Sequence, residues 1–445
     1  MGERIRSVIC NPHRPLNGAV GGSETSFGLN ALVLLLSVGV TATAYLGGLT
    51  SYVSLFAVLV ASLLVLTVAL EWAIFRRRAA VCQLTVRRKR SWKRIAYREL
   101  ALLATFGVIG FAYWLLPIFD DRAMQICYFP FLSILFPFLL VMSVPYFWFM
   151  DTRDEEEEDV LCRIGRAFVT RRKTVTRFEL GNYVRSWIIK AFWLGVMQPP
   201  LIEKMRIFIC YRWSKLAHDP LELFLMLSAI CYAMDLCYAA SGYLLNLKAF
   251  NTHTRTAEPT LLGWVAGLFC YWPFWGILFY PYFFKYEMPT QWHSLFATGG
   301  VAWWCWGAAI LALEALYAFA TISAGIRFSN LTYRGLWNTG PYRWTKHPAY
   351  VFKGLSWWLI YVPFFVNSGA VAVKCTLLLV GVNLVYFLRA RTEERHLSHY
   401  PEYVAYALSM NERSVFRWCA RILPFLKYRP PAAEDRLFDV SREVV

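Results

Sequence analysis

One short stretch near the C-terminal third of the chain holds the densest group of side chains that could bind a small molecule. Pro341 and Pro348 bracket a turn, and Pro348 suits the first position of a helix, where its missing N–H costs nothing. The helix start then leaves unpaired backbone N–H groups beside Arg343, Lys346 and His347, which attracts carboxylate or phosphate. The aromatic faces in the same stretch, which can hold an adenine ring or a sulfonium cation, are Tyr342, Trp344 and Tyr350.

A second group of charged residues follows the last hydrophobic segment, at 371–388. In a continuous helix, Glu393 lies four residues after Arg389. Glu394 lies three residues after Arg391, so both pairs are neighbours on the helix surface. The pairs are either exposed ion pairs, each worth about a few tenths of a kcal/mol, or part of a binding site.

An apolar hairpin, from Phe352 to Leu388, connects the two groups. Both ends of such a hairpin must reach the same membrane face, so the two groups converge at the water–lipid boundary. A cationic and aromatic helix start that faces an Arg/Glu helix end has the composition of a small-molecule site. We therefore predict one site that both groups build.

The elements that must position this site are membrane helices. Of the 445 residues, 58% are hydrophobic and 17% are charged, whereas soluble domains carry roughly a quarter of charged residues. This composition predicts an all-α, polytopic transmembrane helix bundle of about 8–10 spans, with a C-terminal helical hairpin that forms the site. Ten segments are apolar enough to be candidates: 29–50, 51–75, 99–119, 127–149, 184–202, 221–246, 261–284, 299–323, 352–367 and 371–388.

Two of the ten segments have an alternative interpretation. Segment 184–202 carries Lys190 and ends in Pro199 and Pro200, so it is either a span or an amphipathic helix in the interface. Segment 261–284 contains two prolines and is a candidate for a re-entrant segment.

Basic residues indicate which face is cytoplasmic. The formal net charge is +17, and arginine and lysine gather at 76–78 and 87–90, after the second segment. The positive-inside bias places this loop and the N-terminus in the cytoplasm, and ten spans would return the predicted site to the cytoplasmic side. Basic residues at 204–215 would then lie outside, against the bias.

Composition also limits the partners. Basic loops in a membrane protein do not imply nucleic acid: they either set the topology without any ligand or contact the headgroups of membrane lipids. The eleven cysteines form no Cys-x-x-Cys pair, and we predict no metal site. We divide the chain into an N-terminal transmembrane bundle of unknown role with basic cytoplasmic loops (1–300), a membrane core (301–425) and a polar C-terminal tail (426–445), and the oligomeric state stays open.

The two groups together resemble a known family, the integral membrane methyltransferases of the isoprenylcysteine carboxyl methyltransferase and phospholipid methyltransferase type. The resemblance covers roughly residues 300–425. The matching residues are Gly340, Tyr342, His347, Pro348 and Tyr350 in the first half, and Arg389, Glu393, Glu394, Leu397, Tyr403 and Tyr406 in the second. The departures are Lys346 in place of arginine, Phe352 in place of glycine, and His399-Tyr400-Pro401 in place of an aromatic-glycine step.

The resemblance implies S-adenosylmethionine as the cofactor and methyl transfer to a lipid or lipid-linked acceptor, a carboxylate or an amine, that enters between helices. The methyl group already lies on a sulfonium, so in-line displacement needs alignment and desolvation. The residues implied to bind the cofactor are Tyr342, Arg343, Lys346, His347, Pro348 and Tyr350. The residues implied to act in catalysis, by positioning the cofactor ammonium and the acceptor, are Arg389, Arg391, Glu393 and Glu394.

Two other functions remain open. Membrane reductases of the sterol reductase type resemble this hairpin but use NADPH, whose 2′-phosphate calls for a richer arginine cluster. A non-catalytic lipid-binding or transport protein is the second alternative, and Asp235 and Glu314, inside hydrophobic segments, would then mark a pathway. The polar loop at 251–259, with His253, Arg255 and Glu258, is either a site entrance or an ordinary turn.

Overall fold

The protein is a bundle of long apolar helices. The computed structural model describes residues 23–74, 86–116, 128–279, 291–363, 365 and 368–431. Seven helices among these residues are long and apolar enough to cross a membrane, which confirms the predicted all-α, multi-pass membrane protein. They are α2 (Phe27–Leu46), α3 (Tyr52–Ile74), α4 (Trp92–Leu115), α5 (Phe129–Met150), α8 (Pro220–Leu244), α10 (Val301–Ala324) and α12 (Gly369–Leu397).

Three of the ten predicted spans have a different form. Segment 184–202 is the middle of the 34-residue helix α7 (Arg177–Cys210), which runs through Pro199 and Pro200. Segment 261–284 begins as the eight-residue helix α9 (Leu261–Leu268), continues as the π-helix η6 (Phe274–Phe279), and extends into residues outside those described. Helix α11 (Pro348–Tyr361) has 14 residues and a length of about 21 Å, short of a bilayer core of about 30 Å. The expected 8–10 spans are thus more than the seven found in the described residues.

Shorter elements connect the long helices. They are α6 (Val160–Thr170), α13 (Pro401–Arg413), α14 (Arg417–Ile422) and the 3₁₀ turns η4 (Trp213–Ala217), η5 (Lys248–Phe250), η7 (Trp292–Ser294), η8 (Gly325–Arg327), η9 (Gly340–Arg343) and η10 (Pro424–Leu426). Two short strands, β1 (Thr256–Ala257) and β2 (Thr332–Tyr333), pair antiparallel with Thr256 opposite Tyr333. This pairing joins the loop after α8 to the loop after α10.

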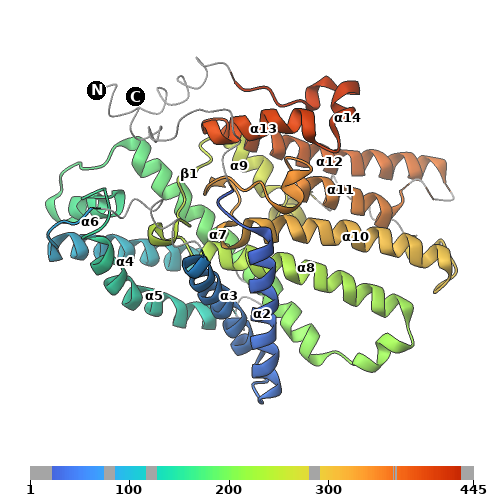
Figure 1. Cartoon of the computed structure of the whole chain (residues 1–445), viewed down its shortest axis with the longest axis horizontal. Coiled ribbons are helices and arrows are strands. Elements are labelled where there is room, and N and C mark those ends of the chain that lie inside the picture. The colour runs from blue at the N-terminus through green and yellow to red at the C-terminus, as the bar shows by residue number, and fades with distance from the viewer. Residues whose placement is uncertain are drawn as a thin grey trace.

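The helices that carry the predicted site lie side by side. Helix α10 packs against α8 and α11, and α12 packs against α11 and α9. Figure 1 shows α8, α10, α11 and α12 running roughly parallel, with α13 and α14 above α12 and with α4, α5 and α6 at the opposite end of the molecule. The site is therefore built where the C-terminal helices meet the loops at one end of α8 and α10.

The beginning of the described chain packs against the predicted C-terminal core. The Thr25 hydroxyl donates to the Ser323 carbonyl at 2.7 Å, and the Asn30 side chain donates to the Ile322 carbonyl at 2.7 Å. The Glu24 N–H donates to the Leu336 carbonyl at 2.7 Å. The division at residue 300 stays a prediction, and these contacts cross it.

Candidate active site

The start of helix α11 has the form that its sequence predicts. Pro348 is the first helical residue, and His347 occupies the N-cap position without a side-chain capping hydrogen bond. The His347 ring instead stacks on the Tyr350 ring, with centroids 5.5 Å apart and planes 9° apart. The first backbone N–H groups of α11 thus have no capping side chain, which favours an anionic group there.

Glu394, near the end of α12, is the centre of the charged cluster. Its carboxylate lies 2.6 Å from Lys346 Nζ and 3.2 Å from His347 Nε2. Arg391 Nη1 donates to its other oxygen at 2.7 Å. The Glu394 side chain is 6% exposed, so three basic groups surround a buried carboxylate. The structure therefore brings the two sequence groups into direct contact at the two ends of the hairpin.

Glu393 and Arg389 do not form the pair that helical spacing predicts. Glu393 Oε2 accepts a hydrogen bond from the Tyr350 hydroxyl at 2.7 Å. Arg389 instead contacts Asn330, in the loop after α10, and Tyr271, just after α9. Of the two spacings that allow an ion pair, the structure forms only the Arg391–Glu394 pair among the described residues.

Arg389 is a buried cation among neutral groups. Its guanidinium donates to the Asn330 side-chain oxygen and, at 3.4 Å, to the Tyr271 hydroxyl. It lies between two aromatic rings, 5.2 Å from the Tyr271 centroid and 5.0 Å from the Tyr350 centroid. No carboxylate of the described residues lies within 4.0 Å of it. A buried guanidinium with neutral partners keeps its charge available to an anionic ligand.

Lys346 has a second neighbour besides Glu394. Its ammonium lies 5.3 Å from the centroid of the Tyr428 ring. Burial lowers the pKa of Lys346, and the charge of Glu394 opposes this effect. Tyr428 is itself buried, and its hydroxyl forms a hydrogen bond of 2.7 Å with Ser398. The far C-terminal part of the described chain thus closes one side of the charged cluster.

The remaining predicted cofactor residues lie on η9 and differ in position. Tyr342 is half-buried, and its carbonyl accepts a hydrogen bond from the Tyr406 hydroxyl at 2.7 Å. Burial and the charge of Glu393 raise the pKa of Tyr342. Arg343 is exposed and forms no ion pair within the described residues, so the structure does not bring it into the cluster.

The loop after α8 contacts the end of α12. Glu258 is buried, and its carboxylate lies 3.5 Å from Arg395 Nη2 and 3.6 Å from His396 Nδ1. Burial raises the pKa of Glu258. His396 also lies 3.0 Å from the Thr256 hydroxyl. The loop at 251–259 therefore packs against the end of α12, next to the charged cluster, and is not an isolated turn.

The other two polar residues of that loop have different surroundings. Burial, together with nearby cations, lowers the pKa of His253 to about 3, so the ring is neutral at pH 7. Arg255 Nη2 pairs with Glu24 at 3.3 Å. Only Glu258 of the three contacts α12 through its side chain.

The sequence did not indicate several residues that hold Arg389. Asn330 and Tyr271 contact it directly, and the Tyr243 hydroxyl accepts from the Asn330 side chain at 2.7 Å. Trp193 of α7 packs edge-on against Tyr271, with ring centroids 5.5 Å apart. Asn330, a polar residue in the loop after α10, was the one feature of the sequence that could have indicated a partner of Arg389.

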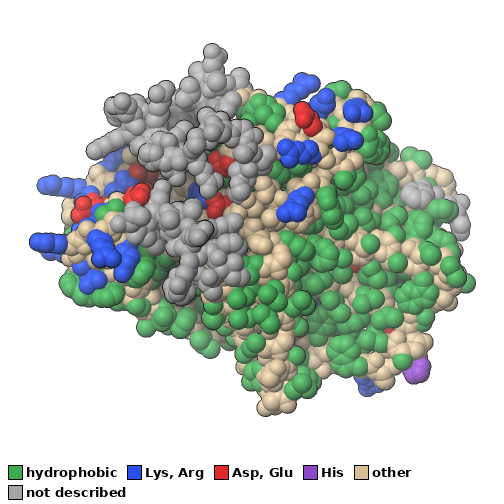
Figure 2. Space-filling view, in the orientation of Figure 1, with side chains coloured by type: hydrophobic (Ala, Val, Ile, Leu, Met, Phe, Trp, Pro, Cys, Tyr) green, Lys and Arg blue, Asp and Glu red, His purple; other side chains and the backbone are tan. Residues whose placement is uncertain are grey.

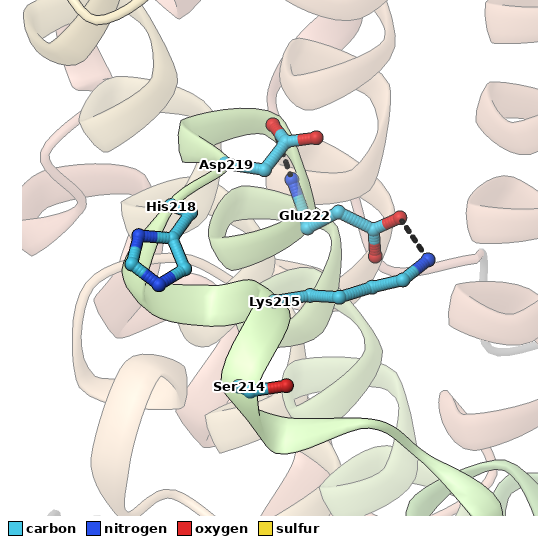
Figure 3. Close-up of a pocket in the computed structure, with 5 residues that line it drawn as sticks. All are labelled: Ser214, Lys215, His218, Asp219 and Glu222. Atoms are coloured by element: carbon cyan, nitrogen blue, oxygen red, sulfur yellow. Dashed lines mark hydrogen bonds and ion pairs between the residues drawn. The ribbon is translucent and has the colours of Figure 1, made fainter.

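An open depression lies elsewhere on the molecule. Figure 3 shows it around η4 and the start of α8, lined by Ser214, Lys215, His218, Asp219 and Glu222. The candidate site lies beyond the other end of α8, near Tyr243. Lys215 and Glu222 form an ion pair of 3.8 Å across the depression. Among the described residues, no group of three or more His, Cys, Asp or Glu side chains could hold a metal ion.

Comparison with protein families gives one match. Residues 307–399 match the isoprenylcysteine carboxyl methyltransferase (ICMT) family, which confirms the resemblance inferred from the two sequence groups. The matched stretch contains α11, the hairpin and Glu394, and ends just after α12. Searches of curated proteins and of solved structures give no match. Together with the seven apolar helices, the match indicates a membrane methyltransferase.

Proposed function

We propose that this ICMT-like membrane methyltransferase takes its methyl group from S-adenosylmethionine and transfers it to a lipid or lipid-linked acceptor at the cytoplasmic face. One observation carries the proposal. The start of α11 and the end of α12 meet through the contact of Lys346 with Glu394, at 2.6 Å, inside the stretch that matches the family. This contact brings an uncapped helix start, which favours an anion, beside a carboxylate.

The charged and aromatic groups of the site fit a cofactor that carries an amino-acid group. S-adenosylmethionine supplies a methyl group that is already activated on a sulfonium sulfur. The uncapped start of α11, with Lys346 and His347, would hold the cofactor carboxylate. Glu393, which is partly exposed, would accept from its ammonium. The stacked rings of His347 and Tyr350 present a face for a sulfonium or an adenine.

Arg389 is suited to the acceptor side of the site. The apolar stretch of α12 ends at Leu388, so Arg389 lies at the water–lipid boundary. Its guanidinium donates to an amide oxygen and a phenol, and it can therefore add an anionic partner. A carboxylate acceptor would pair with it directly, and an amine acceptor would use the neighbouring Glu393. The cytoplasmic face is favoured by the basic loop at 87–90.

Calorimetric titration of the purified full-length chain with S-adenosylmethionine, and in parallel with NADPH, tests this proposal. We expect S-adenosylmethionine to bind, and Glu394→Gln and His347→Ala each to weaken its binding by about tenfold or more, because they remove charge-assisted contacts worth about 1.5–3 kcal/mol. Glu222→Gln is the matched control, because Glu222 lies at the opposite end of α8, and its affinity should equal that of the wild type.

Two results would overturn the proposal. One is a folded protein that binds NADPH and not S-adenosylmethionine, which would favour the reductase. The other is a folded protein that binds neither compound, which would favour a non-catalytic role in lipid binding or transport.

A further inference from the structure

Residues 413–429, here called the C-terminal clasp, expose apolar and basic side chains together. The clasp contains α14 and η10. Its large apolar residues are exposed: Val415 by 54%, Trp418 by 58%, Ile422 by 70%, Leu423 by 44% and Phe425 by 57%. Such a concentration of exposed large apolar side chains outside the membrane-spanning helices marks an interaction surface.

The charges of the clasp are of one sign. Its basic residues, all exposed, are Arg413, Arg417, Arg421, Lys427 and Arg429. The clasp itself contains no acidic residue, and none of the five forms an ion pair within the described part of the chain. Figure 2 shows Lys and Arg side chains gathered over the end of α13 and α14, next to a broad hydrophobic surface. This combination is typical of a segment that lies in a membrane interface.

A contact with α12 fixes the depth of the clasp. The Phe425 ring packs edge-on against Phe387, with centroids 5.8 Å apart. Phe387 and Leu388 are the last residues before the charged end of α12, so Phe425 lies at the level where the apolar stretch ends. The clasp is therefore at the height of the lipid headgroups.

We propose that the C-terminal clasp binds the surface of a bilayer that contains anionic lipids. Its apolar side chains enter the headgroup–acyl boundary, and its arginine and lysine side chains contact anionic headgroups. Charge complementarity and the depth set by Phe387 both favour this occupant over a second protein.

Both ends of the clasp are attached to the candidate active site. The Val415 N–H donates to the Trp344 carbonyl at 3.0 Å. Tyr428 exchanges two backbone–side-chain hydrogen bonds of 2.9 Å with Asn411 and packs against Lys346. Binding of the clasp to lipid therefore orders the groups that enclose Lys346 and Glu394, and anionic lipid strengthens cofactor binding. This second step rests on the proposed function.

Hydrogen exchange of the full-length chain in nanodiscs tests the surface interaction without any cofactor. One set of discs contains phosphatidylcholine, and the other contains roughly a third of phosphatidylglycerol. We expect the amides of the clasp to exchange about tenfold more slowly in the anionic discs. The variant Arg417→Gln/Arg421→Gln should lose this difference. The control Arg171→Gln/Arg172→Gln, in the exposed loop between α6 and α7, should keep it.

Equal exchange in both kinds of disc would overturn the lipid interaction. Exchange that instead slows with protein concentration, irrespective of lipid, would indicate a second copy of the chain and would also overturn it.

Titration of the same discs with S-adenosylmethionine tests the coupling. We expect binding about threefold tighter in anionic discs for the wild type, and no lipid dependence for Arg417→Gln/Arg421→Gln. Equal affinity in both discs would overturn the coupling. Absence of binding in both would contradict the proposed function, while the hydrogen-exchange result would still decide the lipid interaction.

Discussion

Two buried arginines in opposite regions of the molecule have opposite surroundings. In the N-terminal bundle, Arg98 of α4 lies 2.9 Å from Asp151 and 3.1 Å from Asp159. In the C-terminal core, Arg389 of α12 contacts the Asn330 amide oxygen, a phenol and two aromatic rings. Both side chains are almost completely buried. Within the described residues, only Arg98 has a carboxylate partner.

Under the proposed function, the difference is that between a structural charge and a charge available to a ligand. Burying a cation is costly unless an anion accompanies it, and Arg98 is accompanied by two carboxylates. Asp151 follows α5 and Asp159 precedes α6, so these ion pairs connect α4 to both helices. Arg389 lacks this compensation within the described residues. Its neutral partners orient the guanidinium, which under the proposed function can take an anionic acceptor.

The largest expected effect is on stability in the bundle. Arg98→Ala leaves Asp151 and Asp159 with fewer partners inside the fold, so we expect a loss of about 3–5 kcal/mol. A lower thermal midpoint, followed by intrinsic fluorescence in detergent, measures this effect. The folded fraction should bind S-adenosylmethionine with unchanged affinity.

Arg206→Ala is the control for Arg98→Ala. Arg206 also pairs with a carboxylate, Glu203, but both side chains are about half exposed. Its loss should cost less than about 1 kcal/mol. Equal midpoints for the two variants would contradict the interpretation of Arg98 as a buried structural charge.

The next effect is on activity in the core. Arg389→Lys keeps the charge but loses the planar guanidinium, whose Nη2 donates to both Asn330 and Tyr271 and which lies between two aromatic rings. We expect methyl transfer from radiolabelled S-adenosylmethionine into a membrane lipid extract to fall about 100-fold, or about 2.7 kcal/mol. The thermal midpoint should change much less than in Arg98→Ala.

Arg391→Lys is the matched control on the same helix. Arg391 is partly exposed and can contact Glu394 through either kind of cation. Its activity should fall by less than about tenfold. If Arg389→Lys unfolds the protein as Arg98→Ala does, both arginines are structural and the comparison fails.

Local patterns predict most of the fold but not its interruptions. Segments with an uninterrupted apolar run, such as 29–50, form the expected long helices. Segment 261–284 is as apolar, yet its helix α9 ends at Leu268, a few residues before Pro273, and hydropathy does not report where a proline disfavours a continuous helix. The long helix α7 had a local signal that the prediction did not use, the capping box of Thr176 and Glu179.

The sequence predicts only the part of the site that follows from the hairpin connecting its two halves. The hairpin argument brings the two charged groups together, and the structure joins them through Lys346 and Glu394. Helical spacing could not exclude the Arg389–Glu393 pair, because tertiary contacts decide which neighbour each side chain takes. Tyr271 lies 118 residues from Arg389 in the chain, so no local pattern connects them.

A smaller effect tests whether the region outside the family match contributes to the reaction. Tyr271→Phe removes the hydroxyl that accepts from Arg389 and keeps the ring against Trp193. We expect a fall of about threefold to tenfold in methyl transfer, since one hydrogen bond is worth about 0.5–1.5 kcal/mol. Tyr183→Phe, which removes a hydroxyl bonded to Thr105 in the bundle, should leave the rate unchanged. Equal rates for both variants would show that the Tyr271 hydroxyl does not contribute to methyl transfer.

The smallest expected effect distinguishes two cations that the sequence treats alike. Arg343 and Lys346 both precede α11, but Arg343 is exposed, whereas Lys346 is buried against Glu394. Arg343→Ala should change the affinity for S-adenosylmethionine by less than about twofold, because an exposed charge is screened by water and salt. Lys346→Ala should weaken it by about tenfold, measured by the same titration. A stronger effect of Arg343→Ala would mean that the cofactor extends over the surface of η9, and that its binding depends less on the buried charges around Glu394.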